Sequence, residues 1–294
     1  MSVLDLSFAS GESSLSVRRF SVSEEISGMF SASVVARSPR QDLDLATFVG
    51  DTAALHIEGG QAFQTNGGAR TWSGVVSYME QTEVEPTGLS TYFLRIVPSF
   101  WLLTQRRNYR IFQHLSIPDI VDEVLSGWSI TPAWNVARAS YPKLEFKVQY
   151  GETDEDFVSR LLEEAGIAFT FADSDSGASV MTFNDTLHTT EARSGAPLPF
   201  VDNPNQSAEQ ELITEVRFSR EVRPGALAIR DYDFRNPAFP LLGEAPRAPA
   251  PEDRYEQFHY LPGSFLAEGG SGGGTPAADD KGVARYIEDR KSVV

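Results

Sequence analysis

The chain contains no cysteine, only four histidines and no long apolar run. Without cysteine it can form no disulfide scaffold, no cysteine-ligated zinc or iron–sulfur site and no thiol nucleophile. Even the apolar stretch Ile96–Leu103 is far shorter than the ~20 residues that a membrane-spanning helix needs. It is followed at once by Thr104-Gln105-Arg106-Arg107. We therefore expect no stable membrane insertion.

Basic residues are scarce relative to acidic ones. The sequence has 25 Lys and Arg against 41 Asp and Glu, a formal net charge of -16, and its pI is about 4.7. The resulting field repels phosphate backbones, so nucleic acid is not an expected partner. The N-terminus carries Asp5 and Glu12 and neither a basic cluster nor a continuous apolar block. It does not resemble a secretory signal or a transit peptide, and we expect synthesis and assembly in the cytoplasm.

The composition favours a folded, mainly β protein. The length of 294 residues is enough for one large domain or two ordinary ones. Apolar residues make up 41% of it, which is typical of a globular protein. Short alternating segments separated by turn residues fill the first hundred positions, for example Ala53, Leu55 and Ile57 on one face. The segment 90–97 is apolar on much of both sides, which is typical of a strand inside a barrel or sandwich.

One predicted helix covers residues 117–126. Ser116 stands three positions before Asp119, which is the spacing of a capping box, and Pro118 lies in the first turn, where its missing N–H costs little. The apolar residues recur at helical spacing until Gly127, where we expect the helix to end.

A second predicted helix covers residues 154–165, between Thr153 and Gly166. Its first turn carries acids that complement the helix dipole, namely Asp154, Glu155 and Asp156. We expect Phe157 and Leu161 to be buried, so that truncating either costs about 3 kcal/mol or more. Neutralising Asp154 or Glu155 is expected to cost roughly a few tenths of a kcal/mol through the dipole.

Other segments have strand patterns. In 143–150 the apolar positions alternate with polar ones, which predicts a strand with one set buried, namely Leu144, Phe146, Val148 and Tyr150, and the other set outside, namely Glu145, Lys147 and Gln149. Residues 167–183 predict a hairpin that turns near Asp173–Gly177. The β pattern returns in 211–222 and 226–234, and a glycine run at 269–274 indicates a flexible loop.

No motif predicts catalysis, a cofactor or a metal. The histidines His56, His114, His188 and His259 stand singly, without the spacing of a metal site. The G-x-S-x-G match at Gly269–Gly273 lies in the glycine run rather than between a strand and a helix. The acids near residue 154 are explained by capping, although glycosidases also use paired carboxylates. We therefore predict no catalytic, cofactor-binding or metal-binding residues.

One long stretch of the sequence is more informative than these motifs. Residues 106–125 and 141–171 resemble the VgrG family, the spike and hub proteins of bacterial type VI secretion, and hubs of contractile phage tails carry looser versions of the same pattern. The matching residues are Arg110-Ile111-Phe112-Gln113, Pro118-Asp119-Ile120-Val121, Gln149-Tyr150-x-Glu152-x-Asp154, Asp156-Phe157-Val158-x-Arg160-Leu161-Leu162-Glu163-Glu164 and Gly166-Ile167.

The resemblance extends to the flanks, for example Phe48-Val49-Gly50 and Asp231-Tyr232-Asp233-Phe234, and weakens after about Gly263. It implies a structural role, with no catalysis, for a set of motif residues: Arg110, Phe112, Gln113, Asp119, Gln149, Tyr150, Glu152, Asp156, Phe157, Arg160, Leu161, Glu163 and Gly166.

The resemblance also implies an α+β, mainly β architecture with two β-barrel-like hub domains and the two short helices. We expect a first barrel over residues 1–104, a second barrel with both helices over 105–200, and returning strands, Pro/Gly-rich loops and an incomplete C-terminal segment over 201–294. Family members normally continue into an OB-type barrel and a β-helix needle, so we expect these 294 residues to end before the hub is complete.

The function implied is that of a spike hub. In the full-length protein a homotrimeric ring would adapt the hexameric tail tube to the needle, contact baseplate proteins, carry effector or adaptor proteins, and leave the cell on contraction. An alternative is the hub of a contractile phage tail or an extracellular injection particle. A third possibility, from a different class, is an acidic β-rich hydrolase of cell-wall glycan.

Overall fold

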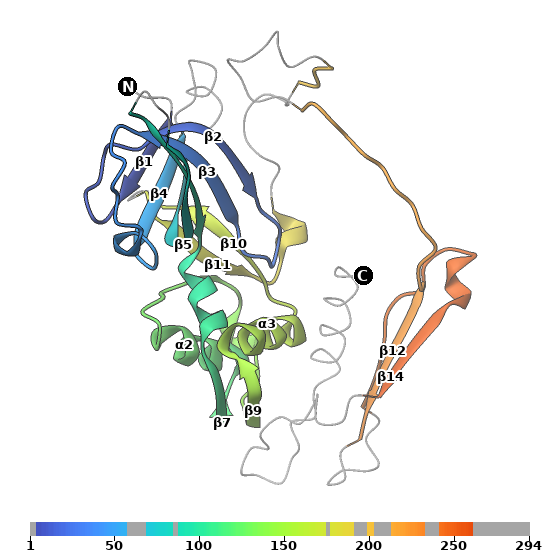
Figure 1. The fold of residues 1–294 in the computed structure, drawn as a ribbon. Helices are drawn as coiled ribbons and strands as arrows, with labels where there is room; N and C mark the ends of the chain where they lie inside the picture. Colours follow the sequence, from blue (N-terminus) through green and yellow to red (C-terminus); the bar gives the residue numbers. More distant parts are fainter. Residues whose placement is uncertain are drawn as a thin grey trace. The chain divides into compact units, whose positions relative to one another are not determined.

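The computed structural model describes residues 4–57, 69–84, 88–174, 177–190, 199–202, 213–232 and 241–260. It is mainly β with few helices, which confirms the predicted fold class (Figure 1). The strands are β1 Leu4–Phe8, β2 Ser16–Ser23, β3 Ser31–Ser38, β4 Thr52–Ile57, β5 Arg70–Val84, β6 Ser90–Val97, β7 Arg107–Leu115, β8 Ala133–Asn135, β9 Leu144–Thr153, β10 Ala168–Asp173, β11 Ser179–Asn184, β12 Ala226–Asp231, β13 Leu241–Glu244 and β14 Glu256–Tyr260; the helices are α2 Ile117–Ser126 and α3 Asp154–Ala165. Within the described ranges, neither these helices nor any other is long and apolar enough to cross a membrane.

The described residues fall into two compact units. The first draws on 1–102, 169–182 and 186–218, and the second on 103–168, 183–185 and 219–294. The chain therefore leaves the first unit near residue 102 and returns to it for β10 and part of β11. The barrel boundaries expected at 104 and 200 stay predictions.

The first unit is built on a six-stranded antiparallel sheet with the order β1-β4-β5-β6-β3-β2. Its two outermost strands, β1 and β2, contact each other, so the sheet is curled. Register shifts in the pairing of β5 with β6, between Val76 and Tyr78 and between Gln81 and Glu83, contribute to this curl because bulges increase strand twist. Gly74 permits a close approach, since a Cβ there would lie 1.9 Å from the carbonyl oxygen of Val97.

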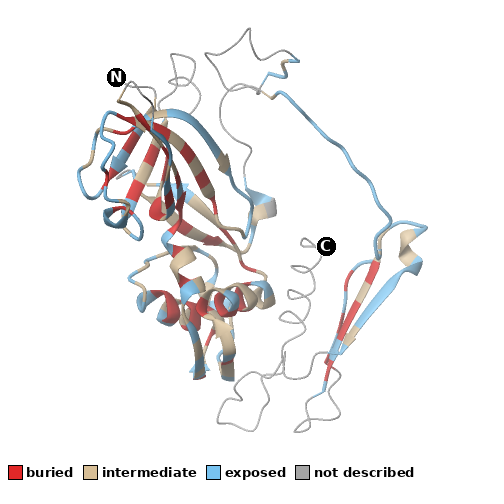
Figure 2. Cartoon of the chain, in the orientation of Figure 1, coloured by how far each residue is buried: buried red, intermediate tan, exposed pale blue. Residues whose placement is uncertain are grey.

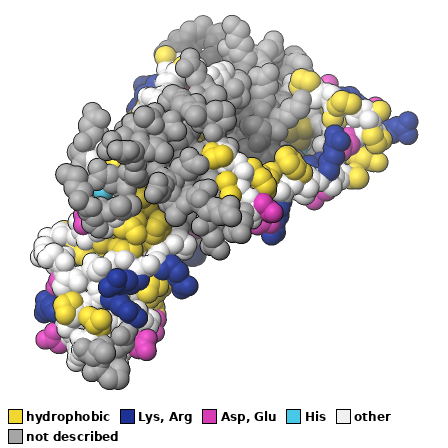
Figure 3. Space-filling view, turned by 90° about the horizontal axis from the view of Figure 1, so that it is seen from above, with side chains coloured by type: hydrophobic (Ala, Val, Ile, Leu, Met, Phe, Trp, Pro, Cys, Tyr) yellow, Lys and Arg dark blue, Asp and Glu magenta, His cyan; other side chains and the backbone are white. Residues whose placement is uncertain are grey.

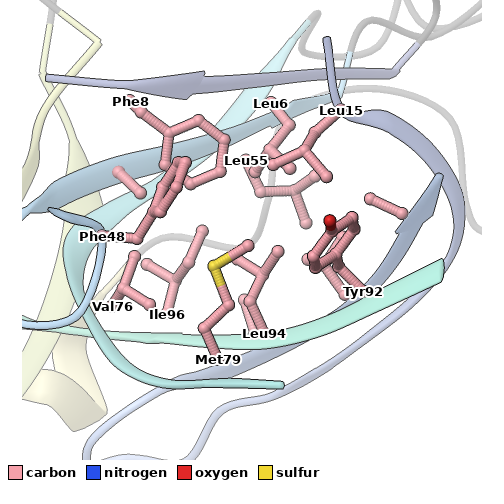
Figure 4. Packing of buried hydrophobic residues seen from close by; sticks show 14 of the residues in the cluster. Leu6, Phe8, Leu15, Phe48, Leu55, Val76, Met79, Tyr92, Leu94 and Ile96 are labelled. Carbon is pink, nitrogen blue, oxygen red and sulfur yellow. The ribbon is translucent and has the colours of Figure 1, made fainter. Parts of the chain in front are cut away.

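The inside of the curl is the hydrophobic core of the first unit. Figure 4 shows side chains from several strands pointing toward one another, and the ring centroids of Phe8 and Phe48 lie 5.0 Å apart in an edge-to-face arrangement. Buried and half-buried residues alternate along β3, as Figure 2 shows. The hydroxyl of fully buried Tyr92 donates to the carbonyl oxygen of Arg40 at 3.0 Å, so this aromatic group satisfies its polar atom inside the core.

The hairpin of β10 and β11 also confirms a sequence prediction. Its turn is closed by hydrogen bonds between Ser174 and Ala178, and the hairpin packs within the first unit. The backbone N–H of Ser27 donates to the carbonyl oxygen of Phe169 at 2.8 Å, and the backbone N–H of Ser73 donates to Ser179 Oγ at 2.9 Å.

The second unit contains a two-stranded antiparallel ribbon of β7 and β9, together with α2 and α3. Both helices begin at capping boxes. The hydroxyl of Ser116 accepts from the N–H of Asp119, and the hydroxyl of Thr153 accepts from the N–H of Asp156. Helix α3 ends at Gly166, whose φ of 66° lies in the left-handed region that favours glycine. Both predicted helices are therefore confirmed at their predicted bounds.

Strands β12, β13 and β14 form a separate three-stranded sheet with the order β13-β12-β14. Strand β12 confirms the β pattern after residue 226, but the prediction for 211–222 is wrong over its described residues, because 214–224 lie in no strand. Phe218 there is 95% exposed. An alternating pattern supplies strand-forming side chains, but a strand also needs a neighbouring edge to bond to, and among the described residues of this segment only Ile213 has one, in an isolated bridge with Phe200.

Candidate functional site

Two of the family-motif residues, Arg110 and Gln149, meet at one buried carboxylate, Asp154, at the start of α3. Its side chain is fully buried and accepts hydrogen bonds from four side chains: Arg106 Nε at 2.6 Å, Arg110 Nη2 at 2.7 Å, Trp128 Nε1 at 2.9 Å and Gln149 Nε2 at 2.9 Å. Its backbone N–H donates to the carbonyl oxygen of Arg106 at 3.0 Å. We call these five residues the Asp154 cluster.

The electrostatics of the cluster keep Asp154 ionised. Burial by itself would raise the pKa of the carboxyl, but the hydrogen bonds from Gln149, Trp128 and Arg106 and the charge of Arg110 together hold that pKa below its usual range. The guanidinium of Arg106 also stacks over the ring of Trp128, with 4.5 Å between the guanidinium carbon and the ring centroid. A buried charge with this many partners ties β7, β9 and α3 into one arrangement.

Asp154 therefore corrects the expectation that its neutralisation would cost little. The sequence places it in the first helical turn, where an exposed acid interacts only with the dipole. The structure adds two arginines and a tryptophan from distant positions in the chain, of which Arg106 and Trp128 were not predicted. The available signal was the motif Gln149-Tyr150-x-Glu152-x-Asp154, in which the glutamine and the final aspartate are now hydrogen-bonded to each other.

A second group of motif residues joins β9 to the exposed side of α3. Arg160 pairs with Glu152 at 2.6 Å and with Glu164 at 3.1 Å, and its Nη2 donates to the carbonyl oxygen of Val148 at 3.2 Å. The hydrogen bond with Glu152 is the main reason why the pKa of Arg160 is raised, and burial opposes it. Lys147 also pairs with Glu164, at 2.5 Å.

The remaining motif residues pack or cap. Phe112 of β7 stacks on Phe157 of α3, with ring centroids 5.4 Å apart, and Leu161 of α3 is also fully buried. Asp119 and Asp156 complete the two capping boxes, and Arg138 binds Asp119 at 2.8 Å. Glu163 and Gly166 lie at the end of α3, where the N–H of Gly166 donates to the carbonyl oxygen of Glu163.

The side of β9 that faces inward was predicted incorrectly. Phe146 is 58% exposed and Tyr150 is 79% exposed, whereas Gln149 is fully buried in the Asp154 cluster. The alternation itself is present, but the polar side faces α3. The reason is that Gln149 and Lys147 have specific partners there, and Phe112 of β7 fills the apolar part of that interface. Motif residues Gln113 and Tyr150 lie on the opposite, outer side of the ribbon.

The described residues offer no cluster of three or more His, Asp or Glu side chains that could hold a metal ion. The ring of His56 hydrogen-bonds to Thr71 at 2.8 Å. The side chain of His188 and the glycine run at 269–274 lie outside what the structure describes. On the face seen in Figure 3, Lys and Arg side chains are interspersed with Asp and Glu. In α3, the carboxylates of Asp154, Asp156 and Glu164 make contacts within the second unit.

Comparison with known proteins gives consistent relatives. A family model described as "Phage tail baseplate hub (GPD)" matches residues 23–286. The type VI secretion system spike protein VgrG4b of Pseudomonas aeruginosa is 34% identical over 256 residues, which is 86% of this chain and 30% of that protein. VgrG1c of the same organism is 29% identical over 259 residues, 87% of this chain and 34% of that protein. The chain thus spans about a third of these relatives.

Solved structures agree on the fold. An E. coli protein, c3393, described as a component of the type VI secretion system, superposes with a TM-score of 0.56 and 26% identity over 64% of this chain and 51% of its own. A tail protein from Neisseria meningitidis gives a TM-score of 0.55 at 11% identity over 88% of this chain and 71% of its own, which supports the fold alone. The resemblance to VgrG proteins is confirmed, and because the hub model matches most of its length, the chain belongs to the phage tail baseplate hub (GPD) family.

Proposed function

We propose that these residues are part of the structural hub at the base of a type VI secretion spike. In the full-length protein, three copies form a ring that adapts the hexameric tail tube to the puncturing needle and helps to deliver effectors. The observation that carries this proposal is the match to the hub family over residues 23–286. The identity with VgrG spike proteins supports the secretion system as the setting.

The proposed role is passive, and we propose that the chain is not an enzyme and that its motif residues are structural. The contacts of the second unit support this, because its motif carboxylates are engaged in folding. Asp154 binds two arginines, Glu152 binds Arg160, and Asp156 caps its own helix. A general acid or base needs a carboxyl group that is free to exchange a proton with substrate.

Assembly and transport follow from the same role. The partners proposed are the other two hub copies, the hexameric tail-tube protein, baseplate proteins, and effector or adaptor proteins, with no nucleic acid. The protein is assembled in the cytoplasm and leaves the cell when the sheath contracts. The domains proposed are a barrel over 1–104, a second over 105–200, and 201–294 returning to them.

A second candidate is the hub of a contractile phage tail or an extracellular injection particle. The match to the phage tail baseplate hub family supports this candidate. The third candidate, a glycan hydrolase, would need a pair of carboxyl groups on either side of a sugar bond. A glycan-release assay on purified cell wall tests it directly, and release above background would overturn the passive role.

The hub proposal is tested by measuring the molar mass of the protein in solution. Light scattering of the full-length protein at micromolar concentration should give a trimer, and the trimer should co-sediment with assembled tail-tube protein. Residues 1–294 alone should give a monomer or a weak oligomer, because the extensive trimeric contacts lie in the needle. A full-length protein that stays monomeric, or a trimer that does not bind the tube, would contradict the proposal.

A further inference from the structure

Residues 214–224 form a segment that belongs to no helix or strand and leads into β12. All of these residues are exposed, as the pale blue of this run in Figure 2 shows, and Phe218 is 95% exposed. Within the described part of the chain their backbone groups make no hydrogen bond with another backbone group, although Ile213 just before them and Gly225 just after them do. We call residues 214–224 the exposed segment.

The backbone of the exposed segment is extended. Ion pairs join Glu215 to Arg217 and Glu221 to Arg223, in each case between side chains two positions apart. Such side chains share a side of an extended chain, whereas in a helix they point in different directions. The Arg217 side chain is 85% exposed, and an ion pair at this exposure is weak. The segment therefore presents an extended backbone and an accessible guanidinium group.

The tripeptide at the centre of the exposed segment also occurs in a paired strand. Arg19-Phe20-Ser21 in β2 has the same three residues as Arg217-Phe218-Ser219. In β2, Arg19 pairs with Val35 and Phe20 pairs with Val34 of β3, and Phe20 is 36% exposed against 95% for Phe218. The two tripeptides share their local chemistry and differ in the pairing of their backbone.

This difference decides how each tripeptide can bind to an endoprotease. An extended peptide is bound through its main-chain hydrogen bonds, as in the addition of a strand to a sheet edge, so a strand that is already paired must open first. Cleavage of such a strand follows the population of the opened form. An endoprotease of the trypsin type also selects a cationic side chain through an acidic pocket. Arg217 offers this side chain on a backbone that needs no opening.

We propose that the peptide bond between Arg217 and Phe218 is a cleavage site for a trypsin-type endoprotease in the unassembled chain. The reaction is hydrolysis: the C–N bond breaks, and water adds its hydroxyl to the Arg217 carbonyl carbon and its proton to the Phe218 nitrogen. The products carry a carboxylate on Arg217 and an ammonium group on Phe218. The cut lies where the chain passes from the first unit to the second, ahead of β12, β13 and β14. This inference does not depend on the proposed hub function.

Limited proteolysis tests the proposal. The native 294-residue chain is treated with a small amount of trypsin, and the new amino termini at Phe20 and Phe218 are quantified over time by mass spectrometry. The terminus at Phe218 should form at least about tenfold faster, because the bond in β2 is cut only from an opened form. Equal rates at the two bonds, or no cutting at Phe218, would contradict the proposal.

Synthetic peptides of residues 14–25 and 212–223 control for the neighbouring sequence. Neither peptide contains the fold, so the bonds after Arg19 and Arg217 should be cut at similar rates. If the peptides showed the same preference as the folded chain, the neighbouring residues rather than backbone pairing would account for it, and the proposal would fail.

A matched pair of substitutions completes the test. Arg217→Gln should abolish the terminus at Phe218, because it removes the guanidinium group that the protease selects. Arg19→Gln, in the paired tripeptide, should leave the rate at Phe218 unchanged. If Arg19→Gln slowed cutting at Phe218, the exposed segment would become accessible only after the first unit had been cut, and the proposal would be wrong.

Discussion

Strands β6 and β9 have similar alternating sequences, but they bury opposite sets of side chains: β6 buries its apolar set and β9 buries its polar set. In β6 of the first unit, the large apolar side chains of Tyr92, Leu94 and Ile96 are fully buried. In β9 of the second unit, Phe146 and Tyr150 are exposed and Gln149 is buried. Alternation thus indicates which residues share a side of a strand, but the partners available on each side decide which side is inside.

The two units also differ in the contacts that stabilise each of them internally. The first closes a curled sheet over apolar side chains, so its stability comes from burial. The second has a small helical core and, in addition, the buried carboxylate of Asp154, which joins β7, β9 and α3. The predictions below separate these two sources of stability.

The largest effects are expected in the apolar cores. Phe157→Ala should lower the free energy of unfolding by about 3–5 kcal/mol and Leu94→Ala by about 2–5 kcal/mol, since both side chains are fully buried. Urea denaturation measures both. If Phe157→Ala lowered the free energy of unfolding by less than about 1 kcal/mol, α3 and the ribbon would have to move together and fill the space of the deleted ring.

The next largest effect is expected from the buried carboxylate of the second unit. Asp154→Asn removes the charge that binds Arg106 and Arg110 while keeping the shape of the side chain. We expect a loss of about 2–3 kcal/mol, below the roughly 3–5 kcal/mol of a fully buried pair, because both guanidinium groups reach water.

The matched control for this substitution is Glu155→Gln, one residue along the same helix. Its carboxylate accepts a hydrogen bond from Ser159 at 2.9 Å and makes no contact with the Asp154 cluster, so the expected loss is roughly a few tenths of a kcal/mol. Secretion by the full-length variant should be unchanged. Equal losses at 154 and 155 would contradict a specific role for the cluster.

The last prediction concerns the response of stability to acid. The pKa of Asp154 is lowered in the folded state, and the pKa of Asp119 is lowered mainly by its hydrogen bond with Ser116. A lowered pKa contributes stability that is complete above the unfolded value, about 3.9, and is lost as the pH falls through the folded value. Stability should therefore decrease as the pH falls below about 4.

The Asp154→Asn variant should show a shallower decrease over the same pH range, because one of the carboxyl groups with a lowered pKa no longer titrates. Denaturant midpoints measured from pH 6 to pH 2 test this. Identical pH profiles for the variant and the unsubstituted protein would show that Asp154 contributes nothing to the acid response.

The sequence alone was sufficient for the two helices, their capping boxes and the hairpin of β10 and β11. These elements depend on contacts only a few residues apart, such as Thr153 with Asp156, so the local pattern contains both partners. The motif residues came from the resemblance to the VgrG family, which gave no indication of their contacts.

Only the tertiary structure decided which side of β9 is buried and how Asp154 is used. The partners of Asp154 lie 48 positions away at Arg106, 44 at Arg110 and 26 at Trp128, beyond the reach of any periodic pattern. Once these donors converge, burying a charged and polar side of the ribbon becomes favourable, since each polar atom has a partner. That convergence leaves Tyr109, Ile111, Phe146 and Tyr150 on the outside.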